Sequence, residues 1–142
     1  MLLNRHMEKI KTLILLLTIV YNIHSCSSGG DYTKELSGGY FFRDEGTDIH
    51  DILSHRPSGK DIPANILSYN YNDTLIIATQ KPNKINDPLY DEVYRYKEGK
   101  QKIYYWLVYH PKSLRLGPMT KADFLKARKK YKVPDELKLE EP

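Results

Sequence analysis

The chain has 142 residues, which is enough for one domain and too few for two of ordinary size. Its 28% charged and 40% hydrophobic residues exclude a polytopic membrane protein and argue against wholesale disorder. A single cysteine excludes an internal disulfide and a multi-cysteine zinc site, and the formal net charge of +4 must be located before an anionic partner is inferred.

Residues 1–25 have the pattern of a secretory signal peptide. A basic start precedes an apolar run over residues 13–20, and small or polar residues follow it. The apolar core spans about 8–10 residues, whereas a membrane-spanning helix needs about 20. The segment therefore predicts export with later cleavage and no permanent transmembrane anchor. Translation could begin at Met1 or at Met7.

The only cysteine follows this segment directly. The run Ile23-His24-Ser25-Cys26 resembles the bacterial lipobox, although His24 stands where a small or hydroxyl residue is usual. The resemblance implies cleavage before Cys26 by the type II signal peptidase, a diacylglycerol on the thiol and an acyl chain on the new amino group. Several chains together anchor a protein stably in a membrane. The alternative is an ordinary secretory peptide cut nearby, with Cys26 a chance free thiol.

The positive charge belongs partly to the signal peptide. Removing residues 1–25 takes away three basic residues and one acidic residue, which leaves 19 basic and 17 acidic residues. Much of what remains basic gathers in residues 126–132. No nucleic-acid-binding motif is present, so we expect no nucleic-acid partner. A solvated helix face is the simpler interpretation of the basic run, and contact with anionic lipid headgroups is the alternative.

Turn residues and β-rich runs divide the rest of the chain. We expect residues 26–37 to be a lipidated cysteine and flexible tether, 38–138 a single β-rich domain and 139–142 a tail. Strand-forming patterns occur at residues 40–43, 49–54, 66–71, 74–80, 93–96, 103–109 and 114–116.

Two hairpins are predicted from these runs. Asn72-Asp73 separates the strands 66–71 and 74–80, and two residues tolerant of positive φ favour a tight turn. A second hairpin is expected to join residues 93–96 to residues 103–109. The latter run has large apolar side chains at both parities, which is typical of a central strand covered on both faces.

A helix is expected near the C-terminus. Gly117-Pro118 should stop the preceding strand, Thr120 is a suitable N-cap with Asp123 three residues later, and Pro134 should end the helix. The expected fold is therefore α+β and β-rich, an antiparallel meander sheet of about five to seven strands with one C-terminal helix.

Several short motifs in a fixed order resemble a family of small uncharacterised bacterial lipoproteins. The family pattern is Ile-Pro, Ile-Ile-Ala-x-Gln, Tyr-Trp followed by two aliphatic residues, then Gly-Pro and Phe. Here it corresponds to Ile62-Pro63, Ile76-Ile77-Ala78-Thr79-Gln80, Tyr105-Trp106-Leu107-Val108, Gly117-Pro118 and Phe124. The resemblance implies lipidation and a single β-rich domain, and it supplies no activity or catalytic residues.

Residues suited to catalysis or metal binding are few. His50 and His55 lie near Asp51, but an extended strand directs them to different faces, and a zinc site would have to recruit His110 from elsewhere. Ser54 with His55, and Ser58 with Asp61, are neighbours only in sequence, and no Gly-x-Ser-x-Gly nucleophile elbow occurs. We therefore expect no catalytic residues, no metal, no cofactor and no enzymatic activity.

Tyrosine is the unusual residue, with 12 copies against three phenylalanines and one tryptophan. Rings that share a strand face can form a recognition surface, because tyrosine is apolar with a polar tip, or they can simply pack. The candidate binding surface comprises Tyr69, Tyr71, Tyr94 and Tyr96.

These features predict an envelope lipoprotein held in a membrane through Cys26, with a binding module as its domain. An envelope protein or a glycan is the expected partner. Ser27 and Ser28 after the cysteine favour an outer-membrane location facing the periplasm, by resemblance to known sorting signals. The alternatives are an inhibitor or immunity-like protein that blocks a hydrolase with a loop at residues 81–88, and a small envelope hydrolase.

Overall fold

The structure is a computed structural model that describes residues 31–46, 49–57, 59–84, 87–90 and 92–140. The predicted signal peptide and Cys26 lie outside these residues. Asp31–Pro142 form one compact unit. Among the residues described, no helix has both the length and the apolar character needed to cross a membrane.

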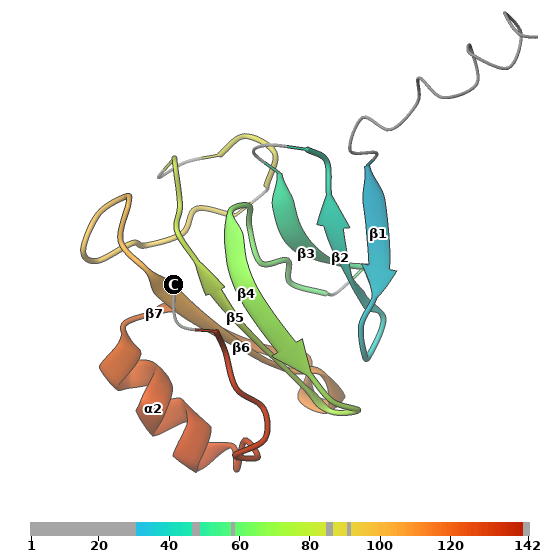
Figure 1. Cartoon of the computed structure of the whole chain (residues 1–142), viewed down its shortest axis with the longest axis vertical. Helices are drawn as coiled ribbons and strands as arrows, with labels where there is room; N and C mark the ends of the chain where they lie inside the picture. Colours follow the sequence, from blue (N-terminus) through green and yellow to red (C-terminus); the bar gives the residue numbers. More distant parts are fainter. Residues whose placement is uncertain (1–30, 47–48, 58, 85–86, 91, 141–142) are drawn as a thin grey trace, which may run out of the picture. The chain divides into compact units, whose positions relative to one another are not determined.

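The described residues form two antiparallel sheets and one α-helix, which confirms the predicted β-rich α+β class (Figure 1). The strands do not form one meander, because they divide between a three-stranded and a four-stranded sheet. The first sheet comprises β1 (Tyr32–Glu35), β2 (Tyr40–Asp44) and β3 (His50–Ser54). The second comprises β4 (Ile66–Tyr71), β5 (Leu75–Gln80), β6 (Tyr104–Tyr109) and β7 (Leu114–Met119), with the 3-10 turn η1 (His110–Lys112) before β7 and the helix α2 (Lys121–Lys130) after it.

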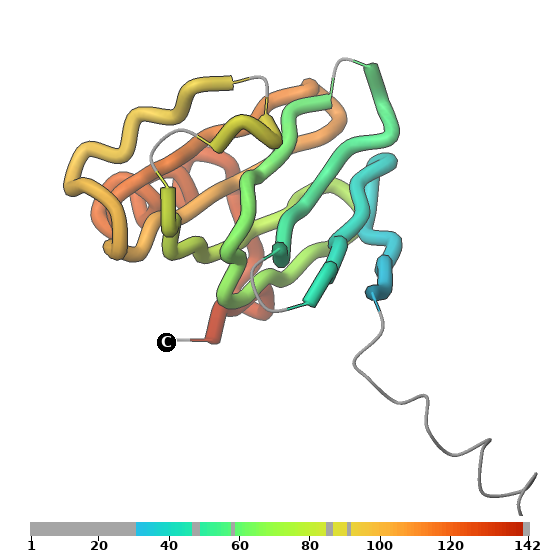
Figure 2. Tube along the Cα trace, turned by 90° about the horizontal axis from the view of Figure 1, so that it is seen from above, coloured from blue at the N-terminus to red at the C-terminus, as the bar shows by residue number. Residues whose placement is uncertain are grey.

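Two hydrophobic cores lie on opposite faces of the second sheet (Figures 1 and 2). The core between the two sheets contains Phe42 and Ile52 from the first sheet with Ile76 and Trp106 from the second. The other core lies between the second sheet and the helix, and it is built from Leu75, Ile77, Leu107, Phe124, Ala127, Val133 and Leu137. Strand β5 is buried along its whole length because both faces are covered.

The first predicted hairpin is confirmed. Strands β4 and β5 pair antiparallel, with Tyr71 opposite Ile76 at the turn end. The side-chain oxygen of Asn72 accepts hydrogen bonds from the backbone N–H groups of Thr74 (3.0 Å) and Leu75 (2.9 Å). The turn therefore closes through a local side chain, which explains why sequence alone could locate it.

Strand β6 is central, as predicted, between β5 and β7. The expectation that Gly117-Pro118 would end the next strand was wrong, because β7 continues to Met119. Proline is tolerated there because β7 is an edge strand, and the register shifts opposite Trp106. Gly117 has φ +138°, and an added Cβ would lie 2.3 Å from the Trp106 ring.

The second predicted hairpin was wrong. Residues 93–96 form no strand, and β6 pairs with β5 and β7 instead. The tyrosines of this segment pack against the core between the sheets and use their hydroxyl groups as hydrogen-bonding partners. An alternating aromatic pattern predicted backbone pairing, whereas side-chain packing determines the conformation here.

The ends of the domain extend further than expected. Residues 32–35, which the sequence assigned to the tether, form β1 and pair with β2 from Tyr32 opposite Asp44 to Glu35 opposite Phe41. Near the other end, the backbone N–H of Glu140 donates to Ser68 Oγ at 3.0 Å, although the sequence placed this residue in a tail.

The C-terminal helix begins as predicted. The hydroxyl of Thr120 accepts a hydrogen bond from the Asp123 backbone N–H at 3.2 Å and donates to the Asp123 carboxylate at 3.0 Å. That hydrogen bond is the main reason that the pKa of Asp123 lies below its usual value. The helix ends at Lys130, and Pro134 follows in a short non-helical segment.

Candidate functional site

The four tyrosines of the predicted binding surface occupy two separate places. Tyr69 and Tyr71 lie on β4, while Tyr94 and Tyr96 lie in the irregular segment before β6. The rings of Tyr94 and Tyr96 are 6.3 Å apart. The structure therefore brings the members of each pair together, and it places the pairs on different elements.

Tyr94 packs into the core and is only 8% exposed. Its hydroxyl accepts a hydrogen bond from Arg115 at 3.3 Å and donates to the Asp61 carbonyl at 3.5 Å. Burial raises the pKa of Tyr94, and the nearby Arg115 guanidinium acts in the opposite direction. This ring lies inside the domain, where it cannot offer a flat surface to a partner.

Tyr96 is half-buried, and its hydroxyl belongs to a polar cluster around Gln80. The Gln80 amide donates to Tyr96 Oη (3.1 Å) and to the carbonyls of Pro63 (3.0 Å) and Ala64 (2.9 Å). Its Oε1 accepts from Trp106 Nε1 at 2.8 Å. Burial raises the pKa of Tyr96 to about 12. The cluster joins the segment before β4 to β5 and β6, so its role is architectural.

Tyr69 and Tyr71 remain half-buried on β4, where Lys34 of β1 covers both rings. The Lys34 ammonium lies 5.6 Å from the centroid of the Tyr69 ring and 5.7 Å from that of Tyr71. Tyr69 also stacks on Phe42 at 4.7 Å between centroids. A shallow pocket of about 240 Å³ opens beside them, lined by Phe42, Ile66, Leu67, Ser68, Tyr69 and Glu140.

The three histidines considered for catalysis or zinc contact different groups. His50 Nε2 is 3.3 Å from Asp44, and His55 Nε2 is 3.1 Å from Glu35. His110 lies in η1, and its ring packs against Gly38 of the β1–β2 turn. No group of three or more His, Cys, Asp or Glu residues suited to a metal ion occurs in the described part of the chain.

The loop expected to enter a hydrolase is attached to the domain at its start. The Lys81 backbone N–H donates to the Asn65 carbonyl at 3.0 Å, and the Gln101 N–H donates to the Pro82 carbonyl at 3.1 Å. Pro82 is buried. Residues 85–86 of this loop lie outside the described residues.

The charges of the domain are segregated along the chain. Residues 95–132 contain twelve Lys and Arg against two Asp and Glu, a formal net charge of +10. Residues 31–94 carry −5 and residues 133–142 carry −3. A count over the whole chain conceals this polarity, and a windowed charge count would have revealed it.

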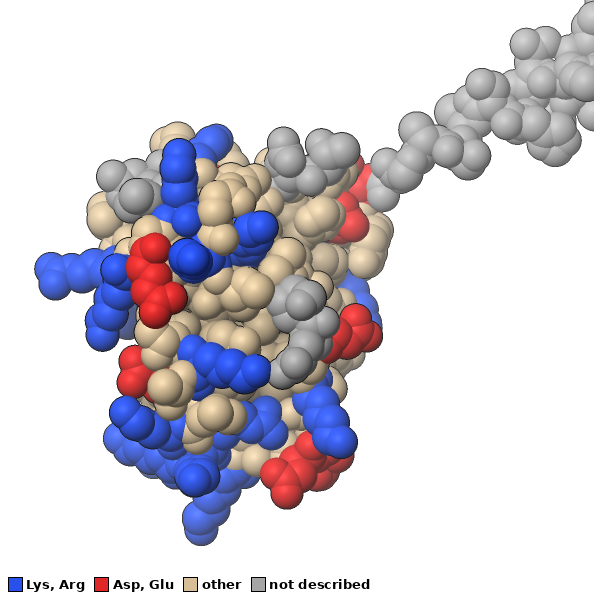
Figure 3. Space-filling view, turned by 60° about the vertical axis from the view of Figure 1, so that its left-hand side comes forward, with Lys and Arg blue, Asp and Glu red and all other residues tan. Residues whose placement is uncertain are grey.

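Helix α2 carries much of this positive charge. Figure 3 shows Lys and Arg side chains crowding the lower part of this face, where the helix lies, with few Asp or Glu among them. The exposed cations of the helix and its end are Lys121, Lys126, Lys129, Lys130 and Lys132. The loop before β6 adds to the same surface, because Lys97 is close enough to Asp123 to help lower its pKa. We call the exposed lysines at 97–102 and 121–132 the cationic face.

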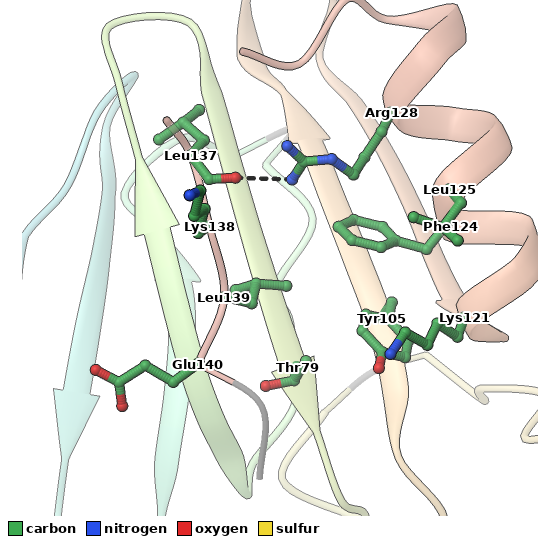
Figure 4. Close-up of a pocket in the computed structure, with 10 residues that line it drawn as sticks. All are labelled: Thr79, Tyr105, Lys121, Phe124, Leu125, Arg128, Leu137, Lys138, Leu139 and Glu140. Atoms are coloured by element: carbon green, nitrogen blue, oxygen red, sulfur yellow. Dashed lines mark hydrogen bonds between the residues drawn. The ribbon is translucent and has the colours of Figure 1, made fainter. Parts of the chain in front are cut away.

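A groove of about 250 Å³ runs beside the helix (Figure 4). Phe124 extends from α2 over β6, where its ring stacks on Tyr105 at 5.0 Å. The opposite wall is the chain segment over residues 137–140. Both terminal nitrogens of Arg128 hold that segment, through the carbonyls of Leu137 (2.8 Å) and Pro134 (3.0 Å).

This groove is apolar in its centre and flanked by charge. Phe124, Leu137 and Leu139 line it, with Lys121 and Glu140 among the charged residues around them. Such a lining can hold an apolar group, with charge at its rim to orient it. The groove therefore suits the binding of an apolar group. Among the described residues that line it, no nucleophile is hydrogen-bonded to a base.

A family model described as "Protein of unknown function (DUF3997)" matches residues 39–142. The chain belongs to this family. That agrees with the resemblance to a family with no assigned activity, and it carries no information about lipidation. Neither the curated proteins nor the solved structures contain a match to this chain.

Proposed function

We propose that this protein is an envelope lipoprotein, held in a membrane through lipid on Cys26, whose folded domain is a binding module. The observation that carries the proposal is the lipobox-like run ending at Cys26, because the chain's only cysteine directly follows a signal-like apolar segment. The domain supports it with two filled cores and with exposed charge segregated to one part of the chain.

The length of the linker fits this proposal. Four residues separate Cys26 from Asp31, and β1 begins at Tyr32. An extended chain of that length reaches roughly 20 Å. A lipid on Cys26 would therefore keep the domain close to the headgroups of the membrane that holds it.

The binding role rests on the domain's surface. The groove beside α2 provides an apolar slot with charged residues at its rim, which can hold and orient an apolar group of a partner. An envelope protein or a glycan is the expected partner. The Ser27-Ser28 pair favours the outer membrane with the domain facing the periplasm.

Metabolic labelling with an alkyne analogue of palmitate tests the anchor. We expect label on the native chain, recovery in the membrane fraction, and a mature N-terminus at Cys26 by mass spectrometry. Cys26→Ala should abolish all three, and Ser27→Ala is the matched control that should retain them. Absence of label from the native chain would overturn the lipoprotein proposal.

Crosslinking in intact cells tests the binding role. The native chain should be captured with a reproducible partner. Recovery of the protein alone under crosslinking would contradict the binding module. Separation of the two membranes by density would test the outer-membrane assignment.

A further inference from the structure

We propose that the cationic face, with α2 at its centre, binds a membrane surface through its anionic phospholipid headgroups. This contact does not depend on the proposed lipid anchor and is tested without it. Lipid phosphates match the chemistry of this face, because they present many negative charges on a surface with no fixed geometry.

The side chains of the cationic face favour such a surface. Every exposed cation within residues 97–102 and 121–132 is a lysine. Arg115 and Arg128 are hydrogen-bonded within the domain. Lysine is a flexible point charge that follows a fluid array of phosphates, whereas arginine suits fixed, bidentate recognition.

An exposed leucine stands among these lysines. Leu125 is 50% exposed on α2, with Lys121 and Lys129 one turn away on either side and Lys126 beside it. An apolar side chain surrounded by lysines is the pattern of a helix lying in a membrane interface, where the apolar group enters the acyl boundary and the lysines reach phosphates. Leu125 and Lys121 also line the groove beside α2.

Helix α2 is also firmly fixed to the domain, so its outer face is a rigid platform. Phe124 and Ala127 are buried on the inner face, and Arg128 binds two carbonyls of the segment that follows.

A fluorescent probe at Leu125 tests the contact directly. The full chain carrying Leu125→Cys is purified from membranes, labelled with an environment-sensitive dye and reconstituted in vesicles of phosphatidylglycerol with phosphatidylcholine. In the acylated protein Cys26 has no free thiol, so the dye reports one position. The matched control is Leu89→Cys, because Leu89 is 60% exposed and lies in the acidic part of the domain.

The expected result is a blue shift at position 125 in the anionic vesicles, with no shift at position 89 and none at either position in phosphatidylcholine alone. A water-like spectrum at position 125 in anionic vesicles would overturn the proposal. Equal shifts at both positions would overturn it too, since they would mean that this face has no preference for the membrane.

Charge removal provides the second test, on a chain with Cys26→Ser so that the lipid does not dominate binding. Lys126→Gln, Lys129→Gln and Lys130→Gln together should weaken binding to the anionic vesicles by roughly 100-fold, from about fivefold for each lysine. The control triple, Lys60→Gln, Lys81→Gln and Lys84→Gln, removes the same charge elsewhere and should change binding less than about threefold. Both variants carry the same N-terminal segment, so their difference reports the lysines.

These results separate the inference from the proposed function. An unacylated Cys26 with lysine-dependent vesicle binding would overturn the anchor and keep the contact. An acylated Cys26 with equal effects of the two lysine triples would keep the anchor and overturn the contact. Tighter binding of the same lysines to a soluble polyanion, without a shift at position 125 on vesicles, would replace the membrane with an acidic macromolecule.

Discussion

The guanidinium of Arg43 holds the carboxylate of Asp51, which is 0% exposed, through two hydrogen bonds. Arg43 Nη2 lies 2.6 Å from Oδ2 and Nε lies 3.0 Å from Oδ1, while Tyr90 Oη donates to Oδ2 at 2.7 Å. Burial and the hydrogen bond to Asp51 raise the pKa of Tyr90, and the hydrogen bond to Asp51 raises the pKa of Arg43. The negative charge of the buried Asp51 carboxylate on β3 is therefore stabilised from two sides. Arg43 binds it from the paired strand β2, and Tyr90 binds it from the loop that follows β5.

Arg43→Met is expected to lower the free energy of unfolding by about 3–5 kcal/mol, because it leaves the Asp51 carboxylate buried without its cation. Urea unfolding followed by circular dichroism measures the change. Glu45→Gln is the matched control, because it removes only the exposed partner of the same arginine, 3.1 Å away, and should cost less than about 0.5 kcal/mol. Equal costs for the two variants would contradict the importance of the buried pair.

Gln80→Asn should cost about 3 kcal/mol of stability. The shorter side chain cannot reach the carbonyls of Pro63 and Ala64 and the indole of Trp106 together, so buried polar groups lose their partners. The same substitution at Gln101, whose exposed amide donates to Asn83, should change stability by less than about 0.5 kcal/mol. Thermal unfolding distinguishes the two variants. A small loss of stability for Gln80→Asn would show that the Gln80 amide does not hold Pro63, Ala64 and Trp106 together.

Two glycines with similar backbone angles separate steric contact from backbone strain. Gly38 has φ +65° and an added Cβ would lie 2.2 Å from His110 Cγ, whereas Gly46 has φ +80° with open space around it. Gly46→Ala should cost about 1–2 kcal/mol from the left-handed backbone alone, and Gly38→Ala should cost at least about 2 kcal/mol more. Adding His110→Ala to Gly38→Ala should recover much of that difference in chemical denaturation, and no recovery would show that the ring is not the obstacle.

Alkaline pH should destabilise the domain through its buried tyrosines. Burial raises the pKa of Tyr96 to about 12, whereas a tyrosine in the unfolded chain ionises near pH 10. The contribution is complete below pH 10, and stability falls as pH rises from about 10 to 12, because the unfolded state releases its proton first. Since the ring is partly exposed, we expect a loss of about 1–2 kcal/mol from this group.

Urea unfolding across that pH range measures the effect. Burial also raises the pKa of Tyr90 and Tyr94, so Tyr96→Phe should reduce the dependence on pH without abolishing it. Refolding on return to neutral pH is the control for irreversible damage. Identical slopes for the native chain and Tyr96→Phe would exclude Tyr96 from the transition.

Local signals explain the parts of the fold that were predictable. The hairpin around Asn72 and the helix start at Thr120 each depend on side chains within three residues of the backbone groups that they bind. The apolar run that became β6 identified a strand covered on both faces. A sequence window contains all of the atoms that decide such features, so it is sufficient to find them.

The candidate site was less predictable. An aromatic alternation at Tyr94 and Tyr96 looks the same whether the rings pack or bind, and the contacts that decide it come from Gln80 and Arg115, at least 16 residues away. The cationic face was present in the sequence as a charge polarity. The exposure of Leu125 could be recognised only from the structure, which shows that Phe124 and Ala127 form the buried face of α2.

By itself, the sequence determined the β-rich α+β class, the first hairpin, the central strand and the start of the helix, because hydrophobic period, turn residues and caps act over short distances. Tertiary structure alone decided that the strands form two sheets, that Asp51 and Gln80 are buried with partners, and which lysines surround Leu125 on the outer face of α2. Those features depend on burial, and burial is set by contacts between residues that lie far apart in the chain.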